Sequence, residues 1–298
     1  MQLFLLLSMV LVSFSATPSA RAQSPTDPKL TKALQDVYAY WRDAMKKKNH
    51  AAWKQITASH RQMAIKNRIM SERGRFPQDV FRVPGTPPAA ASLKLLRSRY
   101  KGMTAKQVYF GKVDFGVGGA PSDNLLVLSF VYESGGWKYD SAEFVNLGGL
   151  KDVRTQLMSG NLKYVDGEAF LPDGKVPVKP MEVGMAKYIA KVYTYCPGRE
   201  VRASVNKISK HRFQNDTRSE VVIGGVRDGM NEIQFWIKDL PGYKGDDPLT
   251  VRVYIFPQVE GHKPVKVFQY QTIKGEKPKL TAKEMFNIGP DDVKRIGR

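Results

Sequence analysis

The amino-acid sequence predicts an α+β fold, in which helices precede a curled antiparallel sheet, followed by an all-β sandwich. Between residues 28 and 72 apolar side chains recur every three or four positions, which is the period of an amphipathic helix. After Gly102 the period changes to two, as in a strand. From residue 186 onward, short apolar segments alternate with Gly, Pro and Asp turns. Short strands at even spacing without helices favour an antiparallel sandwich.

The first 22 residues are typical of a secretory signal peptide. Residues 3–12 are an apolar run too short to span a bilayer, and Ala-Arg-Ala at residues 20–22 provides a cleavage site before Gln23. An uncleaved N-terminal anchor is the alternative. No later segment reaches the roughly 18 apolar residues that a transmembrane helix needs. We therefore expect an exported protein, periplasmic or secreted, with no transmembrane span in the mature chain.

Three helices are predicted before the first sheet. Asp27 is placed to cap a helix that begins at Pro28 and runs to about residue 48. Asn49 can cap a second helix, and a third is predicted over residues 59–72. Residues 74–91 contain several prolines and are expected to form a loop, after which residues 93–100 are expected to form a short helix.

Three strands follow, over residues 108–115, 125–132 and 137–145. A glycine-rich turn separates the first two, and Glu-Ser-Gly-Gly at residues 133–136 predicts a tight hairpin between the others. Helices followed by a meander that ends in Gly-Gly-Trp-Lys-Tyr-Asp at residues 135–140 resemble the cystatin-like, nuclear-transport-factor-2-like superfamily. The resemblance covers residues 29–150. It implies a cone-shaped fold whose concave sheet holds a pocket, used for catalysis in some members and for binding or dimerisation in others.

The second half is predicted to be all β. The first domain is expected over residues 28–165, a linker over 166–180, a sandwich over 181–274, and a docking or loosely ordered tail over 275–298. Strands are predicted over residues 188–195, 200–208, 218–223, 231–237, 250–256 and 265–273. Short helices are expected around residues 281–286 and after Pro290. Residues 226–235 resemble the turn-into-strand pattern of exported immunoglobulin-like sandwiches, in which Asn231 would bond turn backbone while Ile233 and Phe235 face the core.

The chain is strongly basic, with 47 Lys and Arg against 28 Asp and Glu. Residues 28–120 hold 19 of the basic and 5 of the acidic residues, so most of the excess lies there. Such a surface attracts polyanions. We expect an anionic envelope polymer or glycan, or another envelope protein, as the partner; export makes nucleic acid the least favoured. A solvated basic face that serves only solubility is the alternative.

The candidate ligand-binding residues form a basic patch near the junctions of the predicted helices. They are Lys46, Lys47, Lys48, Arg61, Arg68 and Arg75. The last three are seven positions apart and share one helix face if the third helix extends that far.

No metal ion or cofactor is expected. The four histidines are scattered, and no zinc, calcium, dinucleotide or phosphate-loop motif is present in the sequence. The single cysteine, Cys196, cannot form an intrachain disulfide and is expected to be a small semi-buried hydrophobe. An intermolecular disulfide is the remaining option for it.

These patterns favour a non-catalytic, exported two-domain binding or envelope protein. The alternative is a small-molecule enzyme of the isomerase or dehydratase kind that uses the pocket of the first domain. In enzymatic members of the resembled superfamily a carboxylate or His inside the pocket acts as general base, and the candidates on the strands here are Asp114 and Tyr139 or Asp140. The candidate pocket-lining residues are Trp41, Trp53, Tyr100, Asp114 and Tyr139. Competing interpretations place the two tryptophans in the core and Asp114 toward solvent.

Overall fold

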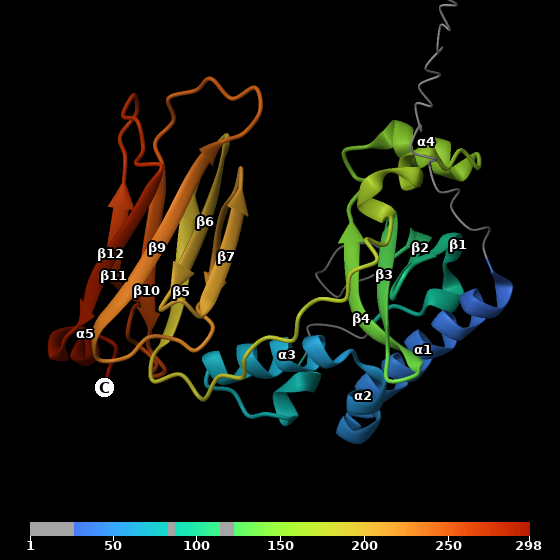
Figure 1. The fold of residues 1–298 in the computed structure, drawn as a ribbon, viewed down its shortest axis with the longest axis horizontal. Coiled ribbons are helices and arrows are strands. Elements are labelled where there is room, and N and C mark those ends of the chain that lie inside the picture. Colours follow the sequence, from blue (N-terminus) through green and yellow to red (C-terminus); the bar gives the residue numbers. More distant parts are fainter. Residues whose placement is uncertain (1–26, 83–86, 114–121) are drawn as a thin grey trace, which may run out of the picture.

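The computed structural model describes residues 27–82, 87–113 and 122–298 (Figure 1). Within these ranges it contains five α-helices and three antiparallel sheets of four strands each, so the protein is mainly β. The expected signal peptide (residues 1–22) and the candidate Asp114 lie outside the described residues.

None of the helices described by the structure is both long and apolar enough to span a bilayer.

The first three helices begin where the sequence predicts. Helix α1 (Pro28–Lys46) is capped by the Asp27 carboxylate, which accepts a hydrogen bond from the backbone N–H of Lys29. Helix α2 (His50–Ile56) is capped in the same way by Asn49, and α3 comprises Ser59–Ser71. The capping side chains satisfy backbone donors that a helix leaves unpaired at its start.

The first sheet has the order β1-β2-β3-β4, in which each strand pairs with the next along the chain. Its strands are β1 (Lys94–Lys101), β2 (Thr104–Lys112), β3 (Asp123–Glu133) and β4 (Gly136–Val145). The tight hairpin between β3 and β4 is confirmed, with Ser134 and Gly135 at φ of 50° and 78°. Positive φ at both central residues is what a type I′ turn requires.

The predicted helix over residues 93–100 is wrong, because this segment is strand β1. Leu96 and Ser98 alternate inward along it, and the strand pairs with β2 from Lys94 opposite Phe110 to Lys101 opposite Thr104. Pairing with a neighbouring strand therefore overrides the helical preference of the local sequence.

Both faces of the first sheet are covered. Helix α1 lies across one face, where Leu34 and Tyr38 pack against Leu126 and Phe130 (Figure 1). The other face is covered by helix α4 (Lys151–Met158) and two 3₁₀ turns (Lys163–Asp166 and Glu168–Phe170). Leu157, Val165 and Phe170 from this cover are buried against the sheet. Phe170 lies in the segment expected to be a linker, residues 166–180, so part of that segment contributes to the core.

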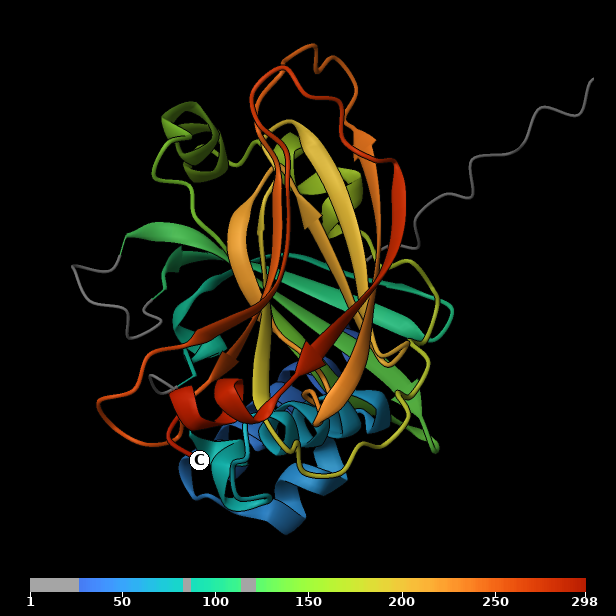
Figure 2. The ribbon, with the colours of Figure 1, turned by 90° about the vertical axis from the view of Figure 1, so that its left-hand side faces the viewer.

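The remaining two sheets pack face to face as a sandwich, with orders β11-β10-β5-β8 and β12-β9-β6-β7 (Figure 2). The strands are β5 (Ile189–Tyr195), β6 (Arg199–Val205), β7 (Ser209–Gln214), β8 (Thr217–Val221), β9 (Gly229–Asp239), β10 (Thr250–Phe256), β11 (Val265–Gln271) and β12 (Thr281–Ile288). Rings from the two sheets meet between the layers, with the centroids of Phe235 and Tyr270 4.8 Å apart. Asn231 bonds the backbone of Arg227 and Gly229, as predicted.

Two strands of the sandwich differ from the sequence prediction. Strand β7 was not predicted from the sequence. The helix predicted over residues 281–286 is wrong, since this segment is strand β12. It pairs with β9 along its whole length and places Phe286 and Ile288 in the core. Helix α5 (Pro290–Arg295) follows, as predicted, and Ile296 is also buried.

The C-terminal half of α3 contacts the chain beyond residue 180. The Asn67 amide donates to the carbonyl of Met181 at 2.8 Å and accepts from the N–H of Val183 at 3.0 Å. The hydroxyl of Ser71 accepts from the N–H of Gly224 at 2.8 Å. These contacts link the helices to the base of the sandwich.

Candidate anion-binding site

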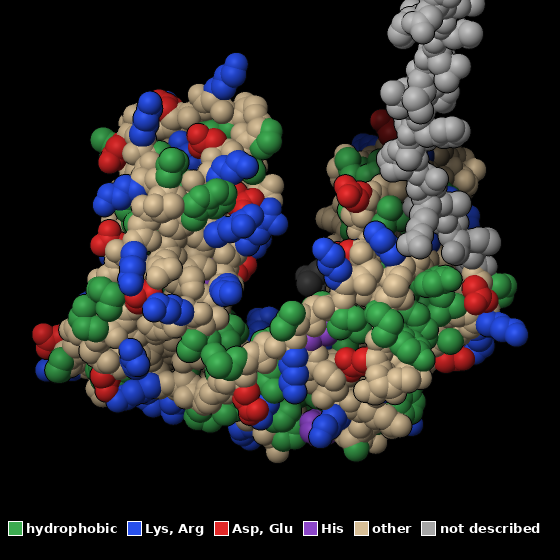
Figure 3. All heavy atoms as spheres, in the orientation of Figure 1, with side chains coloured by type: hydrophobic (Ala, Val, Ile, Leu, Met, Phe, Trp, Pro, Cys, Tyr) green, Lys and Arg blue, Asp and Glu red, His purple; other side chains and the backbone are tan. Residues whose placement is uncertain are grey.

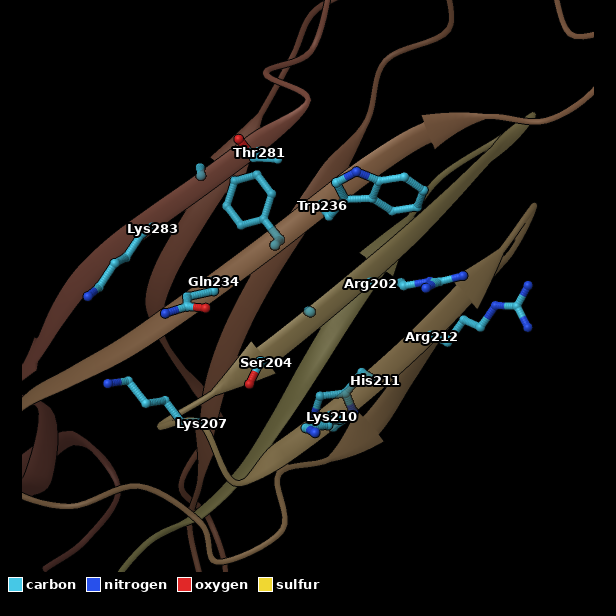
Figure 4. A pocket seen from close by; sticks show the side chains of 13 residues that line it. Arg202, Ser204, Lys207, Lys210, His211, Arg212, Gln234, Trp236, Thr281 and Lys283 are labelled. Carbon is cyan, nitrogen blue, oxygen red and sulfur yellow. The ribbon is translucent and has the colours of Figure 1, made fainter. Parts of the chain in front are cut away.

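The outer face of sheet β12-β9-β6-β7 carries a groove of about 1150 Å³ (Figure 4). It arises from the two-residue period of the strands, which sends alternate side chains to opposite faces. On β6, Val201 and Ala203 enter the core, whereas Arg202 and Ser204 face outward. The same alternation on β7 sends Phe213 inward while Lys210 and Arg212 point outward.

The strand register aligns the groove side chains in two rows across the sheet. The Trp236 row consists of Thr281, Trp236, Arg202 and Arg212, each opposite the next on the neighbouring strand. The Gln234 row consists of Lys283, Gln234, Ser204 and Lys210 (Figure 4). Neighbouring strands lie about 4.8 Å apart, so each row spans roughly 14 Å, and the rows are about 7 Å apart along the strands.

Basic side chains outnumber acidic ones on this face. Its cations are Arg202, Lys207, Lys210, Arg212, Lys238 and Lys283, and its carboxylates are Glu200 and Glu232. Figure 3 shows Lys and Arg side chains over much of the visible face of the sandwich, several of them on the side nearer the first sheet. Clustered charge of one sign in a hollow raises the local concentration of oppositely charged ligands.

Glu200 holds two of the arginines in position. Its carboxylate accepts from Nε of Arg202 at 2.6 Å and from Nη2 of Arg212 at 2.8 Å. The Glu200 side chain is only 9% exposed, whereas both arginine side chains are 60% exposed. Hydrogen bonds from Arg212 and Arg202 lower the pKa of Glu200 to about 2. The ionised carboxylate therefore orients two guanidinium groups whose outer surfaces face solvent.

Trp236 places a half-buried aromatic ring next to Arg202, on the side away from Arg212. The guanidinium of Arg202 lies 5.2 Å from its ring centroid, within the range of a cation–π interaction. Thr281 borders the indole on the opposite side. The Trp236 row therefore combines a flat apolar surface with two cations.

Three side chains at the edge of this sheet have the spacing of a hydrolase triad. Oγ of Ser209 lies 2.8 Å from Nε2 of His211, whose Nδ1 lies 3.0 Å from a carboxylate oxygen of Glu220. However, Ser209 is fully buried, and its hydroxyl already accepts a hydrogen bond from the N–H of Ile223. The arrangement thus bridges the edge strands β7 and β8 rather than presenting a nucleophile to a substrate.

The structure separates most of the basic patch predicted near the helices. Helix α3 ends at Ser71, so Arg75 lies beyond it and does not share its face with Arg61 and Arg68, which are both exposed. Lys46 is exposed on α1. Lys47 forms an ion pair with Asp43 at 2.9 Å, and Arg68 forms one with Glu72 at 3.6 Å.

Two members of that patch meet at a second hollow, of about 440 Å³. Lys48 and Arg75 line it together with Arg82, His50 and Asp79. The Asp79 carboxylate accepts from the backbone N–H of Arg75 at 2.8 Å and so holds the loop that carries this arginine.

The predicted pocket-lining residues are distributed over different environments. Trp41 stacks on Tyr139 with the ring centroids 3.9 Å apart, and burial raises the pKa of Tyr139, so this phenol remains protonated. Trp53 is buried in another cluster, with Ile69 and Val80. Tyr100 lies at the end of β1 and is 46% exposed. The structure thus stacks Trp41 on Tyr139, places Trp53 in a neighbouring cluster against which Trp41 also packs, and leaves Tyr100 apart from both.

Asp140, the residue after Tyr139, pairs with His60. One of its carboxylate oxygens lies 2.8 Å from Nε2 of His60, and both side chains are largely buried. Asp140 also borders a hollow of about 220 Å³. Within the described residues, no group of three or more His, Cys, Asp or Glu side chains could hold a metal ion.

A scan against protein-family models and searches of curated proteins and of solved structures found no match to this chain.

The sequence prediction did not include the groove. A signal for it exists, because basic residues alternate at positions 202, 210 and 212 within strand-like segments and Trp236 lies on a predicted strand. Strand β7 was not predicted, however, and without it Lys210 and Arg212 could not be aligned with Arg202. The register across strands, which sequence periodicity does not give, creates the rows.

Proposed function

We propose that this protein is a non-catalytic, exported binding protein that binds an anionic polymer in the groove on the outer face of β12-β9-β6-β7. The observation that carries the proposal is the pair of side-chain rows, in which four cations and one indole line a single hollow. The rest of the proposal concerns the scaffold. It consists of a cystatin-like α+β domain followed by an immunoglobulin-like sandwich, expected to act in the periplasm or outside the cell.

The arrangement of the core supports the two-domain part of the proposal. Among the described residues, one buried cluster draws only on residues 188–296, and the three others draw on residues 34–170. Separate cores are what independently folding domains require.

The electrostatics of the groove support a polyanionic ligand. Arg202 and Arg212 share one carboxylate, so they retain an excess of positive charge, and Lys207 and Lys210 add to it. A polyanion that binds such a face releases its condensed counterions, and this release provides much of the binding free energy. Affinity should therefore fall steeply as the salt concentration rises.

The enzymatic alternative has weaker support. The stacked rings of Trp41 and Tyr139, two of the residues that this alternative places around a substrate, instead pack against each other and against the core under α1. The hollow beside Asp140, at about 220 Å³, is below the roughly 300 Å³ usual for a small-molecule site.

The test compares two charge variants of the mature protein, residues 23–298. Lys210→Glu with Arg212→Gln changes the groove, and Lys46→Glu with Lys47→Gln makes the same change in net charge on the originally predicted patch. Binding to dextran sulfate is measured at two salt concentrations. We expect the groove variant to bind about tenfold more weakly at low salt, with a shallower salt dependence, and the control to bind within about twofold of the wild type. Equal losses in both variants would overturn the groove as the site.

A further inference from the structure

We infer that the polymer is an acidic polysaccharide that lies across the strands, with one sugar ring stacked on Trp236. This inference rests on the proposed function and specifies the class of ligand. It is drawn from the order of the side chains within the two rows and not from their total charge.

The Trp236 row suits a ring that carries an acidic group. An indole offers an apolar face to the C–H surface of a sugar, and the guanidinium groups of Arg202 and Arg212 follow it on the next two strands. Both guanidinium groups are fixed by Glu200, so they are oriented before a ligand arrives. Planar guanidinium groups bind carboxylates and sulfates through two parallel hydrogen bonds.

The Gln234 row indicates the spacing of charge along the ligand. Lys283 and Lys210 lie at its two ends, and the neutral side chains of Gln234 and Ser204 lie between them (Figure 4). The Nζ of Lys283 also lies 3.0 Å from a carboxylate oxygen of Glu232, so this end of the row carries a paired cation and Lys210 carries the larger share of the net charge. The two cations are therefore separated by three strand spacings, roughly 14 Å. An amide and a hydroxyl between two charges match hydroxyl-bearing neutral units between two acidic ones.

Polymers with a charge on every unit fit this row less well. Polyphosphate or a single-stranded nucleic acid would place anions opposite Gln234 and Ser204, where the row has no cation. It would also bring anions close to Glu232, whose carboxylate accepts from the Gln234 amide at 2.7 Å and pairs with Lys283 at 3.0 Å. A carboxylate at that position can accept hydrogen bonds from sugar hydroxyls but repels phosphate.

The experiment uses three probes: a hyaluronan decasaccharide, in which acidic and neutral sugars alternate, inorganic polyphosphate, and an oligothymidylate. Each is titrated against the mature wild type, Trp236→Ala and Trp236→Phe, with melting temperatures recorded to show that the variants fold. We expect Trp236→Ala to weaken hyaluronan binding about tenfold and Trp236→Phe to weaken it less than about threefold, because a phenyl ring still stacks. Polyphosphate binding should change less than twofold, since it has no ring.

The outcomes separate the two proposals. If Trp236→Ala affects none of the probes while Lys210→Glu with Arg212→Gln weakens all of them, the polysaccharide inference is overturned and the polyanion groove stands. If oligothymidylate binds more tightly than hyaluronan and loses more on removal of Trp236, the ligand class is nucleic acid and the inference is wrong. If the groove charge variant affects no probe, the proposed function fails and this inference fails with it.

The charge spacing has its own test. Lys283→Gln with Lys210→Gln removes both ends of the Gln234 row, and Lys46→Gln with Lys47→Gln is the matched control. The first pair should weaken hyaluronan at least threefold more than the control pair does. An equal effect would show that the ends of the row do not contact the ligand.

Discussion

Thr281 of β12 lies directly opposite Trp236 of β9 in the sheet that bears the groove. The last strand of the protein therefore forms one wall of the groove, and through Phe286 and Ile288 it also completes the core of the sandwich. Binding and folding consequently depend on the same strand, which the sequence prediction had placed in a tail.

The first prediction compares adjacent residues of β12. Phe286 is 5% exposed and packs against Phe268, whereas Met285 is 50% exposed on the groove face. Phe286→Ala should lower the free energy of unfolding by about 3 kcal/mol or more, because it leaves a cavity. Met285→Ala should change it by less than about 1 kcal/mol. Chemical denaturation checks both values. Equal, small effects would mean that β12 packs loosely on the sandwich.

The sequence was sufficient for the elements whose signals are local. Caps at Asp27 and Asn49 marked the helix starts, and the Ser134–Gly135 turn marked the β3–β4 hairpin. It was insufficient where a partner strand decides the conformation. Residues 94–101 and 281–288 have helix-compatible composition but become strands because β2 and β9 pair with them.

The candidate site was harder to predict from the sequence than the fold. The density of basic residues drew attention to the helices, yet α3 ends at Ser71 and so separates Arg75 from the helix face that Arg61 and Arg68 were expected to share with it. The groove, in contrast, depends on which residues lie opposite one another on β6, β7 and β9. A one-residue change in register would reverse the faces, so its residues cannot be grouped until the pairing is known.

The second prediction concerns pH and the buried His211, whose side chain is 2% exposed. Burial lowers the pKa of this imidazole below its usual value of 6.5, despite the opposing effect of Glu220. The unfolded chain thus binds a proton more readily than the folded one, so stability should be fully present above pH 6.5 and decrease as the pH falls below it. His211→Gln should reduce this dependence, whereas His262→Gln, at an exposed site, should retain it. Melting temperatures measured from pH 8 to 5 test the prediction; identical profiles for the wild type and His211→Gln would contradict it.

The third prediction concerns the segment between the two sets of buried clusters. Phe170 belongs to the core of the first sheet, whereas Val178 is 91% exposed. A protease site introduced at residues 176–179 should therefore be cut readily and yield two pieces that each remain folded, because neither loses core residues. Size-exclusion chromatography and thermal melting of the cut protein provide the measurement. A cut in the same place that unfolds the whole chain in one transition would show that the contacts of Asn67 and Ser71 make the protein a single cooperative unit.

The last prediction concerns Glu200, whose replacement changes both the net charge of the groove and the orientation of two arginines. Glu200→Gln makes the groove more positive, which on charge alone should strengthen polyanion binding. It also removes the ionised carboxylate that receives hydrogen bonds from both Arg202 and Arg212. Charge-assisted hydrogen bonds are about twice as strong as neutral ones, so we expect the loss of orientation to dominate and binding to weaken by about threefold. Glu72→Gln, at the C-terminal cap of α3, makes the same change in net charge away from the groove and should leave affinity unchanged or slightly improved.

Stability measured against pH gives the same substitution an independent readout. Because the pKa of Glu200 is lowered to about 2, its contribution to stability is present above its ordinary value of 4.5 and is lost as the pH falls toward 2. The difference in melting temperature between the wild type and Glu200→Gln should therefore be largest above pH 4.5 and should shrink in acid. Tighter polyanion binding by Glu200→Gln, together with a pH-independent difference in melting temperature, would show that the two arginines are not held by this carboxylate. The groove would then act through its net charge alone.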